Sequence, residues 1–131
     1  MLLDTSGLMC LFDKRDIRHA DATRHYSSAH RRLTHNYVLT EFVALALARR
    51  APRSEALQFV DALVSSAEIE VVWVDRNLHE RSMRLLSQRE DKSWSLCDAV
   101  SFVTMKDRDI LEALTTDHDF EQAGLVRLLA Q

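Results

Sequence analysis

The chain has 131 residues, 47% hydrophobic and 28% charged, a balance typical of one globular domain with a single core. With only two glycines and one proline, long helices joined by short loops should dominate. A formal net charge of −3 argues against nucleic-acid binding through overall positive charge, and no apolar run approaches the roughly 20 residues that span a bilayer.

The first half of the chain alternates short apolar segments with helical patterns. We expect a strand at residues 1–3, a helix that begins within residues 5–7, a weakly amphipathic helix over 17–32, a strand at 33–37 and a buried helix over 38–50. Pro52 ends this last helix, and Ser54 can cap the next one.

The second half continues the alternation. The clearest strand covers residues 69–74, and Asp75 can cap a helix that runs to about residue 89. We then expect a largely buried helix over 93–106, a strand at 110–114, a short helix after residues 115–120 and a last strand near 126–128. Strands that alternate with helices predict an α/β fold in one domain, residues 1–131, with a parallel sheet covered on both faces.

The ends of the chain and its cysteines suggest where the protein works. Residues 1–4 lack the basic region and longer apolar stretch of a secretion signal. Cys10 and Cys97 lie inside apolar segments, which indicates buried thiols rather than a disulfide framework. We therefore expect a cytoplasmic protein with no membrane partner.

Carboxylates stand at unusual places in this pattern. Asp4 directly follows the first strand, and ligands of parallel sheets bind beyond the carboxyl ends of the strands, although Asp4 could also simply cap the next helix. Glu41 is the only ionisable residue between positions 38 and 48. A buried, unpaired carboxylate costs several kcal/mol, so Glu41 should meet a cation, unless it is protonated or lies at an exposed edge of the helix.

Two further acidic segments lie in the second half. Asp98 forms a capping-box spacing with Ser95, a structural role that does not prevent it from also binding a metal. Asp117 and Asp119 follow the fourth strand, where an Asp-x-Asp sequence is often only a turn. Together these acids could converge at one end of the sheet, where their mutual repulsion would favour a hard divalent cation such as Mg²⁺.

Other chemistries lack the necessary residues. The histidines and cysteines have no zinc-ligand spacing, and Gly7 and Gly124 are isolated rather than part of a phosphate-binding loop. No Gly-x-Ser-x-Gly elbow occurs. A phosphatase would place an Asp-x-Asp nucleophile near the first strand, where this chain has Asp4-Thr5-Ser6.

Basic residues gather between positions 14 and 35. This segment holds six Lys or Arg against two acids, whereas residues 107–121 hold six acids against one base. We hypothesise that the basic segment lines the path of a phosphate backbone to the acidic cluster. The alternatives are that an acidic protein tail docks on the segment instead, or that it is a solvated helix face. The arginines concerned are Arg15, Arg18, Arg24, Arg31 and Arg32.

The acidic motifs, in this order and spacing, resemble those of PIN-domain ribonucleases, especially the VapC-like toxins of bacterial toxin–antitoxin pairs. The matching pieces are an apolar strand into Asp4-Thr5-Ser6, then Thr40-Glu41, residues 95–99 and residues 114–120, so that the resemblance covers essentially the whole chain. It implies a three-layer α/β/α sandwich with a central, mainly parallel sheet of four to five strands. Where relatives often have glycine before the fourth strand, this chain has Asp109, which tolerates the same left-handed turn less comfortably than glycine.

The resemblance also implies a function. One or two Mg²⁺ or Mn²⁺ ions would be held by Asp4, Glu41, Asp98 and Asp117, with Asp119 at a more variable position and Ser6 or Thr116 as hydroxyl support. RNA would be hydrolysed to a 5′-phosphate and a 3′-hydroxyl, and the partners would be a small antitoxin and a second copy of the chain. The alternatives are an RNA-processing nuclease without an antitoxin and a non-catalytic PIN module that binds RNA or protein.

Overall fold

A central parallel sheet organises the molecule. The computed structural model describes residues 1–130, and over that range the sheet has five strands in the order β3-β2-β1-β4-β5. The strands are β1 (Leu2–Leu3), β2 (Arg32–His35), β3 (Ile69–Val72), β4 (Glu112–Leu114) and β5 (Val126–Arg127). Every neighbouring pair is parallel, so all five strands end at the same edge of the sheet.

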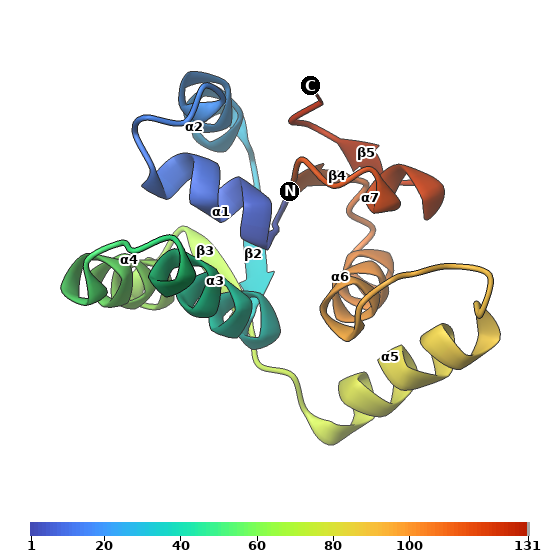
Figure 1. Ribbon diagram of the computed structural model, residues 1–131. Coiled ribbons are helices and arrows are strands. Elements are labelled where there is room, and N and C mark those ends of the chain that lie inside the picture. The colour runs from blue at the N-terminus through green and yellow to red at the C-terminus, as the bar shows by residue number, and fades with distance from the viewer. Residues whose placement is uncertain (131) are drawn as a thin grey trace.

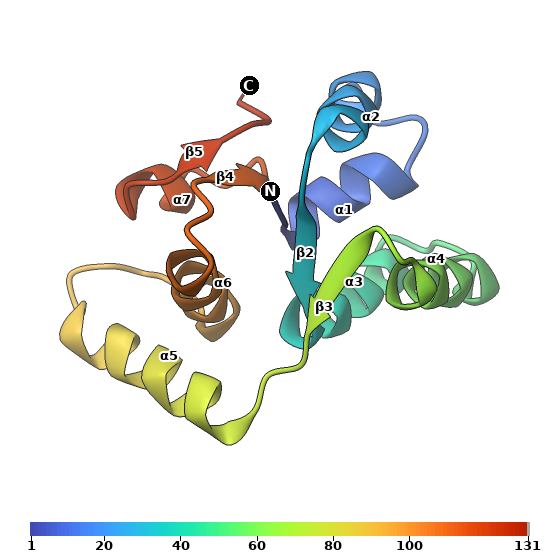
Figure 2. The same ribbon diagram turned by 180° about the vertical axis from the view of Figure 1, so that it is seen from behind.

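Helices cover both faces of this sheet (Figures 1 and 2). They are α1 (Thr5–Phe12), α2 (His19–Ser28), α3 (Asn36–Ala48), α4 (Arg53–Ser65), α5 (Arg76–Gln88), α6 (Leu96–Asp107) and α7 (Asp119–Gln122). The first four gather on one side of the molecule, and α5, α6 and α7 gather on the other (Figure 1). This arrangement confirms the predicted α/β/α sandwich.

The central strand shows how a period of two divides the core. Leu3 packs in the cluster formed with α1 and α3, which includes Leu8 and Phe42. Leu2, its neighbour, packs in a second cluster with Phe102 of α6. Successive side chains of a strand point to opposite faces, so two residues are enough to anchor both layers.

The expected helix over 17–32 is the largest correction to the predicted boundaries, because only residues 19–28 are helical. The backbone N–H groups of Arg15 and Arg18 donate to the Asp13 and Asp16 side chains, which makes this stretch a turn-rich loop rather than the first turn of a helix. At the other end the chain leaves the helix after Ser28, and Arg32 already pairs with β3.

Asp109 adopts the left-handed turn before the fourth strand, although aspartate tolerates this conformation less comfortably than glycine. Asp109 has φ = 53°, and the N–H of Ile110 donates to the carbonyl of Met105, so the turn closes the end of α6. Over residues 1–130, the structure contains no helix that is both long and apolar enough to cross a bilayer.

Candidate metal centre

Asp4 lies at the centre of the carboxyl edge of the sheet, directly after the middle strand. Asp4 is only 5% exposed, although an unpaired carboxylate is costly to bury. It occupies the N-cap position of α1, yet its side chain accepts no capping hydrogen bond. The structural alternative considered for Asp4 is therefore wrong, and its carboxylate is available for another purpose.

A chain of hydroxyl groups holds this carboxylate in place. The Thr115 hydroxyl donates to Asp4 Oδ2 at 2.7 Å and accepts from the backbone N–H of Asp117 at 3.0 Å. With the Thr115 proton directed to the carboxylate, the Ser6 hydroxyl 3.1 Å away must donate to Thr115, while it accepts from the N–H of Thr116. Ser6 thus supports the site as expected, but the hydroxyl that contacts Asp4 belongs to Thr115 and not to Thr116.

Asp98 has the predicted double connection to Ser95. The Ser95 N–H donates to Asp98 Oδ2, and the Asp98 N–H donates to Ser95 Oγ, both at 3.0 Å. This capping box starts α6 and is confirmed. Because a carboxylate has several lone-pair positions, one bond to Ser95 leaves Asp98 free to bind a cation.

Asp117 and Asp119 lie between β4 and the start of α7. Asp117 Oδ1 accepts from the Asp119 N–H at 2.9 Å. Together with His118 they offer ligand atoms that all lie within 4.8 Å of one another. The sequence analysis expected no histidine at this site. His118 is exposed and its Nε2 already accepts a hydrogen bond from the Gln122 amide, so we assign the metal binding to the carboxylates.

The expected burial of Glu41 is wrong. Glu41 is exposed, as are Thr40, Ala44 and Ala48, which form a solvent-facing stripe on α3. Its carboxylate nevertheless acts on the site, because it raises the pKa values of Asp4 and Cys97. Glu41 therefore stands at the open side of the cluster rather than inside the core.

The pKa shifts show that these acids influence one another. Burial, and then the charges of Asp98 and Glu41, raise the pKa of Asp4 to about 7 despite the hydrogen bond from Thr115. Burial also raises the pKa of Asp98, and the charges of Asp117 and Asp119 add to the rise. The structure thus brings all five predicted acids to one end of the sheet.

The donor set fits a hard divalent cation. The groups that converge are carboxylate and hydroxyl oxygens, the ligands that Mg²⁺ and Mn²⁺ prefer. The Cys97 thiol beside them is a poor competitor, because burial and the neighbouring acids Glu41, Asp4 and Asp98 raise its pKa and keep it protonated. A cation would relieve the repulsion that the pKa of Asp4 records.

His35 is a residue of this region that sequence reasoning missed. It is fully buried at the end of β2, where its Nδ1 accepts from the N–H of Val38 and caps α3. Its Nε2 lies 2.9 Å from the hydroxyl of Ser101 on α6. Helix caps are usually Ser, Thr, Asp or Asn, so a histidine gives no cap signal in the sequence.

The basic segment, residues 14–35, is not beside the cluster. Arg31 and Arg32 lie where β2 begins, next to the amino group of Met1, whereas Asp4 follows the end of the neighbouring parallel strand. Arg31 pairs with Glu70, and Arg32 donates to the carbonyl of Tyr26.

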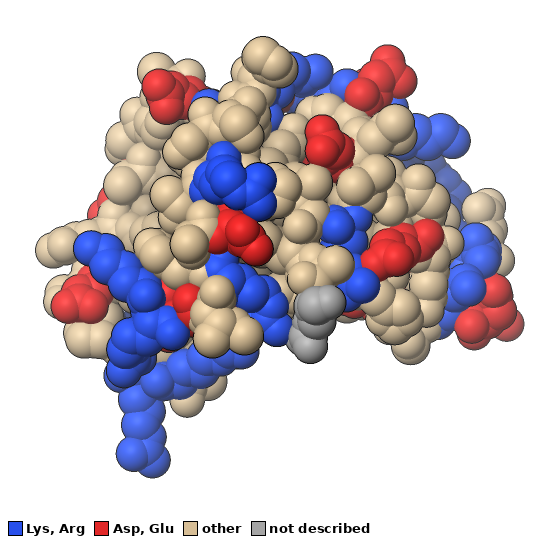
Figure 3. Space-filling view, turned by 90° about the horizontal axis from the view of Figure 1, so that it is seen from above, with Lys and Arg blue, Asp and Glu red and all other residues tan. Residues whose placement is uncertain are grey.

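The remaining arginines of the segment also have partners: Arg15 pairs with Asp13, Arg18 with Asp16 and Arg24 with Asp21. Figure 3 shows basic and acidic side chains interleaved on the face seen from above. Arg31 and Arg32 therefore lie away from the acidic cluster, and binding of RNA or of an acidic protein tail to the segment remains a prediction.

Comparison with known proteins gives consistent results. The family model of the PIN domain matches residues 1–125. Two relatives, the 23S rRNA-specific endonucleases VapC20 of Mycobacterium tuberculosis strains CDC 1551 / Oshkosh and ATCC 25618 / H37Rv, are each 32% identical over 129 residues, which cover 98% of this chain and 97% of the relative.

Solved structures agree. The crystal structure of Mycobacterium tuberculosis VapC20, described as a Sarcin-Ricin loop cleaving toxin, matches with a TM-score of 0.86 at 31% identity and covers 95% of both chains. A toxin–antitoxin complex from Klebsiella pneumoniae matches with a TM-score of 0.69 at 16% identity over 99% of this chain and 98% of that chain, a likeness of fold.

Proposed function

Since this chain belongs to the PIN-domain family and, within it, to the VapC endonucleases, we propose that it is a Mg²⁺- or Mn²⁺-dependent endoribonuclease, the toxin of a toxin–antitoxin pair. The observation that carries the proposal is Asp4, a buried carboxylate whose pKa is raised to about 7 and which has acidic neighbours rather than a basic partner. A protein that only bound RNA or another protein would have no use for this arrangement.

We assign the carboxylates different tasks by their burial. Asp4, held by Thr115, and Asp98, held by Ser95, are the fixed ligands, and Asp117 completes the set. A bound divalent ion would lower the pKa of an attacking water and neutralise charge on the phosphate. Glu41, which is exposed, and Asp119 would orient that water and accept its proton.

The substrate class follows from the relatives. VapC20 is named as specific for 23S rRNA and as a toxin that cleaves the Sarcin-Ricin loop. We propose a loop of ribosomal RNA as the substrate of this chain, which would act in the cytoplasm where ribosomes are. Such loops present unpaired bases that a protein can bind individually.

We further propose a small antitoxin partner and a homodimer. A toxin that attacks ribosomal RNA needs an inhibitor in the cell that makes it, and the Klebsiella pneumoniae structure is of a toxin bound to its antitoxin. Size-exclusion chromatography with light scattering tests the dimer. Co-purification with the product of a neighbouring short gene tests the antitoxin.

The decisive experiment is cleavage of 23S rRNA and of a synthetic Sarcin-Ricin hairpin by the purified protein. We expect cleavage with Mg²⁺ or Mn²⁺, none in EDTA, and a loss of orders of magnitude in Asp98→Asn and Asp117→Asn. Asp61→Asn, an exposed acid on α4, is the matched control and should cleave like the wild type. Cleavage that persists in EDTA would refute the metal mechanism.

A further inference from the structure

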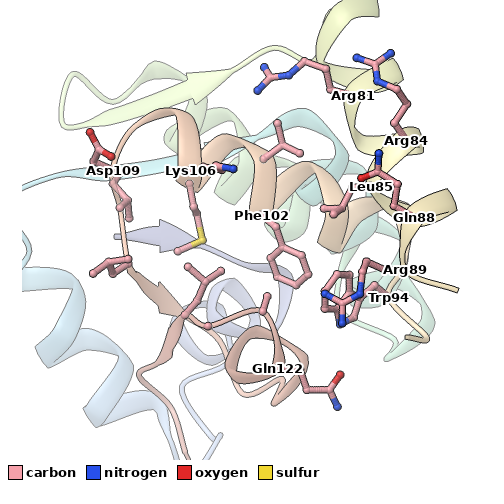
Figure 4. A pocket seen from close by; sticks show the side chains of 17 residues that line it. Arg81, Arg84, Leu85, Gln88, Arg89, Trp94, Phe102, Lys106, Asp109 and Gln122 are labelled. Atoms are coloured by element: carbon pink, nitrogen blue, oxygen red, sulfur yellow. The ribbon is translucent and has the colours of Figure 1, made fainter. Parts of the chain in front are cut away.

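A groove of about 650 Å³ lies between α5, α6 and the segment from α7 to β5, and none of the five acids lines it. Figure 4 shows Phe102 in the middle of this groove, with the side chains of α5 along one wall. Its floor is apolar and is formed by Leu85, Phe102, Met105, Ile110 and Leu125. The volume falls within the range of roughly 300–1,000 Å³ typical of small-molecule sites.

The groove and the acidic cluster share two helices. On α6, Asp98, Phe102 and Lys106 follow one another at intervals of four residues and so lie along one side of the helix. On α7, Asp119 starts the helix and Gln122, which lines the groove, ends it and donates to His118. Along α6, Phe102 lies about one turn, roughly 6 Å, from Asp98, and Lys106 lies about two turns, roughly 12 Å, from it.

The rim of the groove is strongly basic, although the whole chain is acidic. It carries Arg81, Arg84, Arg89 and Lys106, and one acid, Asp109. Arg81 is paired with Asp107 outside the lining, and Arg89 with Asp91. Arg84 and Lys106 are exposed and form no ion pair within residues 1–130, so both are available to an anion.

Trp94, which is 8% exposed, has an unused hydrogen-bond donor. Its ring packs edge-on against Phe102, with centroids 5.0 Å apart, and the guanidinium of Arg89 lies 5.1 Å over it. The indole Nε1 is buried and has no hydrogen-bond acceptor. A buried donor without a partner costs roughly 1–3 kcal/mol, a cost that a ligand oxygen would remove.

We propose that this groove binds an unpaired nucleotide of the RNA substrate that lies further along the chain than the phosphate that is cleaved. The base would stack on the guanidinium of Arg89, which lies over the buried ring of Trp94, and its phosphate would meet Arg84 and Lys106. Aromatic rings and guanidinium planes are the surfaces on which proteins stack unpaired bases. The inference rests on the proposed ribonuclease function and adds to it a contact that selects loop RNA.

The test uses tryptophan fluorescence as a readout that is independent of cleavage. Trp73, which is 62% exposed, is replaced by Phe so that Trp94 is the only tryptophan, and Asp117→Asn prevents cleavage. A short single-stranded RNA oligonucleotide is titrated over a salt series. We expect binding to change Trp94 fluorescence, because a base stacked on Arg89 would lie over the guanidinium that covers the Trp94 ring.

The charge contribution is tested with the pair Arg84→Ala and Lys106→Ala in that background. Losing two phosphate contacts should weaken RNA binding on the order of tenfold at 0.1 M salt and lower the slope of log affinity against log salt by about 1.4. The matched control is Lys14→Ala with Arg24→Ala, two exposed cations before and on α2. This control should bind RNA as before, and neither pair should change Mn²⁺ affinity.

The possible outcomes separate this inference from the proposed function. Metal-dependent cleavage by the wild type, with RNA binding and Trp94 fluorescence indifferent to the groove, would leave the nuclease in place and overturn the nucleotide pocket. Groove variants that bind RNA normally but lose a protein partner would overturn it as well and identify the groove as a protein-binding surface. Absence of RNA binding together with no metal-dependent cleavage of 23S rRNA or of the Sarcin-Ricin hairpin by the wild type would overturn both.

Discussion

His35 donates a hydrogen bond from Nε2 to the hydroxyl of Ser101, 2.9 Å away, and so connects the helix that carries Glu41 to the helix that carries Asp98. The tautomer is fixed by the other nitrogen, since Nδ1 accepts from the N–H of Val38. Burial lowers the pKa of His35 to about 4, so the ring is neutral in the folded protein at pH 7. The relative position of the helices that carry Glu41 and Asp98 thus depends on an uncharged histidine.

This pKa predicts a measurable pH dependence. Between pH 6.5 and 4 the unfolded chain binds a proton at His35 that the folded protein does not, so this residue's contribution to stability falls as the pH falls, by about 1.4 kcal/mol per pH unit. The measurement uses Asp4→Asn in EDTA as the background, with and without His35→Asn. The free energies of unfolding of the two proteins, measured in urea, should converge as the pH is lowered. Asn is a good helix cap, which favours folding of the variant. Ser101→Ala should lower stability but keep the slope, and parallel curves for His35→Asn would contradict the assignment.

The contribution of Asp4 to stability changes with pH in the opposite direction. Its pKa is raised to about 7 from 3.8, so the folded protein without metal binds a proton that the unfolded chain lacks between these values, and stability rises as the pH falls through 7. At pH 8 in EDTA we expect Asp4→Asn to be more stable than the wild type by about 1 kcal/mol or more. Mn²⁺ should stabilise the wild type and leave Asp4→Asn unchanged. Asp61→Asn, an exposed acid, should follow the wild type, and a less stable Asp4→Asn at pH 8 would refute the prediction.

The convergence of the acids could be predicted because it needs only topology. Parallel strands end at one edge of a sheet, so an acid that follows a strand, such as Asp4 or Asp117, must lie at that edge. The strands themselves were identified from their β-branched and apolar residues, and the capping box of Asp98 from its spacing to Ser95.

Side-chain exposure and distance across the fold could not be predicted in the same way. The exposed stripe of α3 contains Ala44 and Ala48, and because alanine counts as apolar the helix looked buried all round and Glu41 with it. The basic segment was assigned to the cluster from composition alone. The direction of β2 instead puts Arg31 and Arg32 at the start of the strand, away from the edge that holds the acids.

Thr115 should be more important than its neighbour Thr116. Thr115→Val keeps the shape but removes the donor to Asp4 Oδ2 and the acceptor for the N–H of Asp117. Leaving these groups unpaired should cost about 1–3 kcal/mol in urea unfolding. The hydrogen bond from Thr115 lowers the pKa of Asp4, so its loss should raise that pKa and weaken Mn²⁺ binding at pH 7 in calorimetric titration.

Thr115→Ser provides the control, since it restores the hydroxyl and should recover most of the Mn²⁺ affinity. Thr116→Val should have little effect, because Thr116 contributes its backbone N–H to Ser6 and its carbonyl to Arg127. Equal losses of Mn²⁺ affinity in Thr115→Val and Thr116→Val would show that the hydroxyl of Thr115 does not position Asp4.

Gly7 allows α1 to approach β4 closely enough to place Asp4. A Cβ at this position would lie 1.9 Å from the carbonyl oxygen of Leu114 and 2.7 Å from its carbon, both backbone atoms that cannot rotate away. The same oxygen accepts from the N–H of Asp4 at 3.2 Å, so a shift of the helix would displace Asp4 as well. We expect Gly7→Ala to lower the free energy of unfolding by about 3 kcal/mol and to weaken Mn²⁺ binding in the fraction that remains folded.

Gly124→Ala is the comparison, since Gly124 has φ = 83° but open space around a Cβ. This substitution should lower the free energy of unfolding only by the backbone cost of about 1 kcal/mol, and Mn²⁺ affinity should be retained. Urea unfolding with Mn²⁺ titration distinguishes the two, and a Gly7→Ala protein as stable as Gly124→Ala would show that α1 can move off β4 without cost.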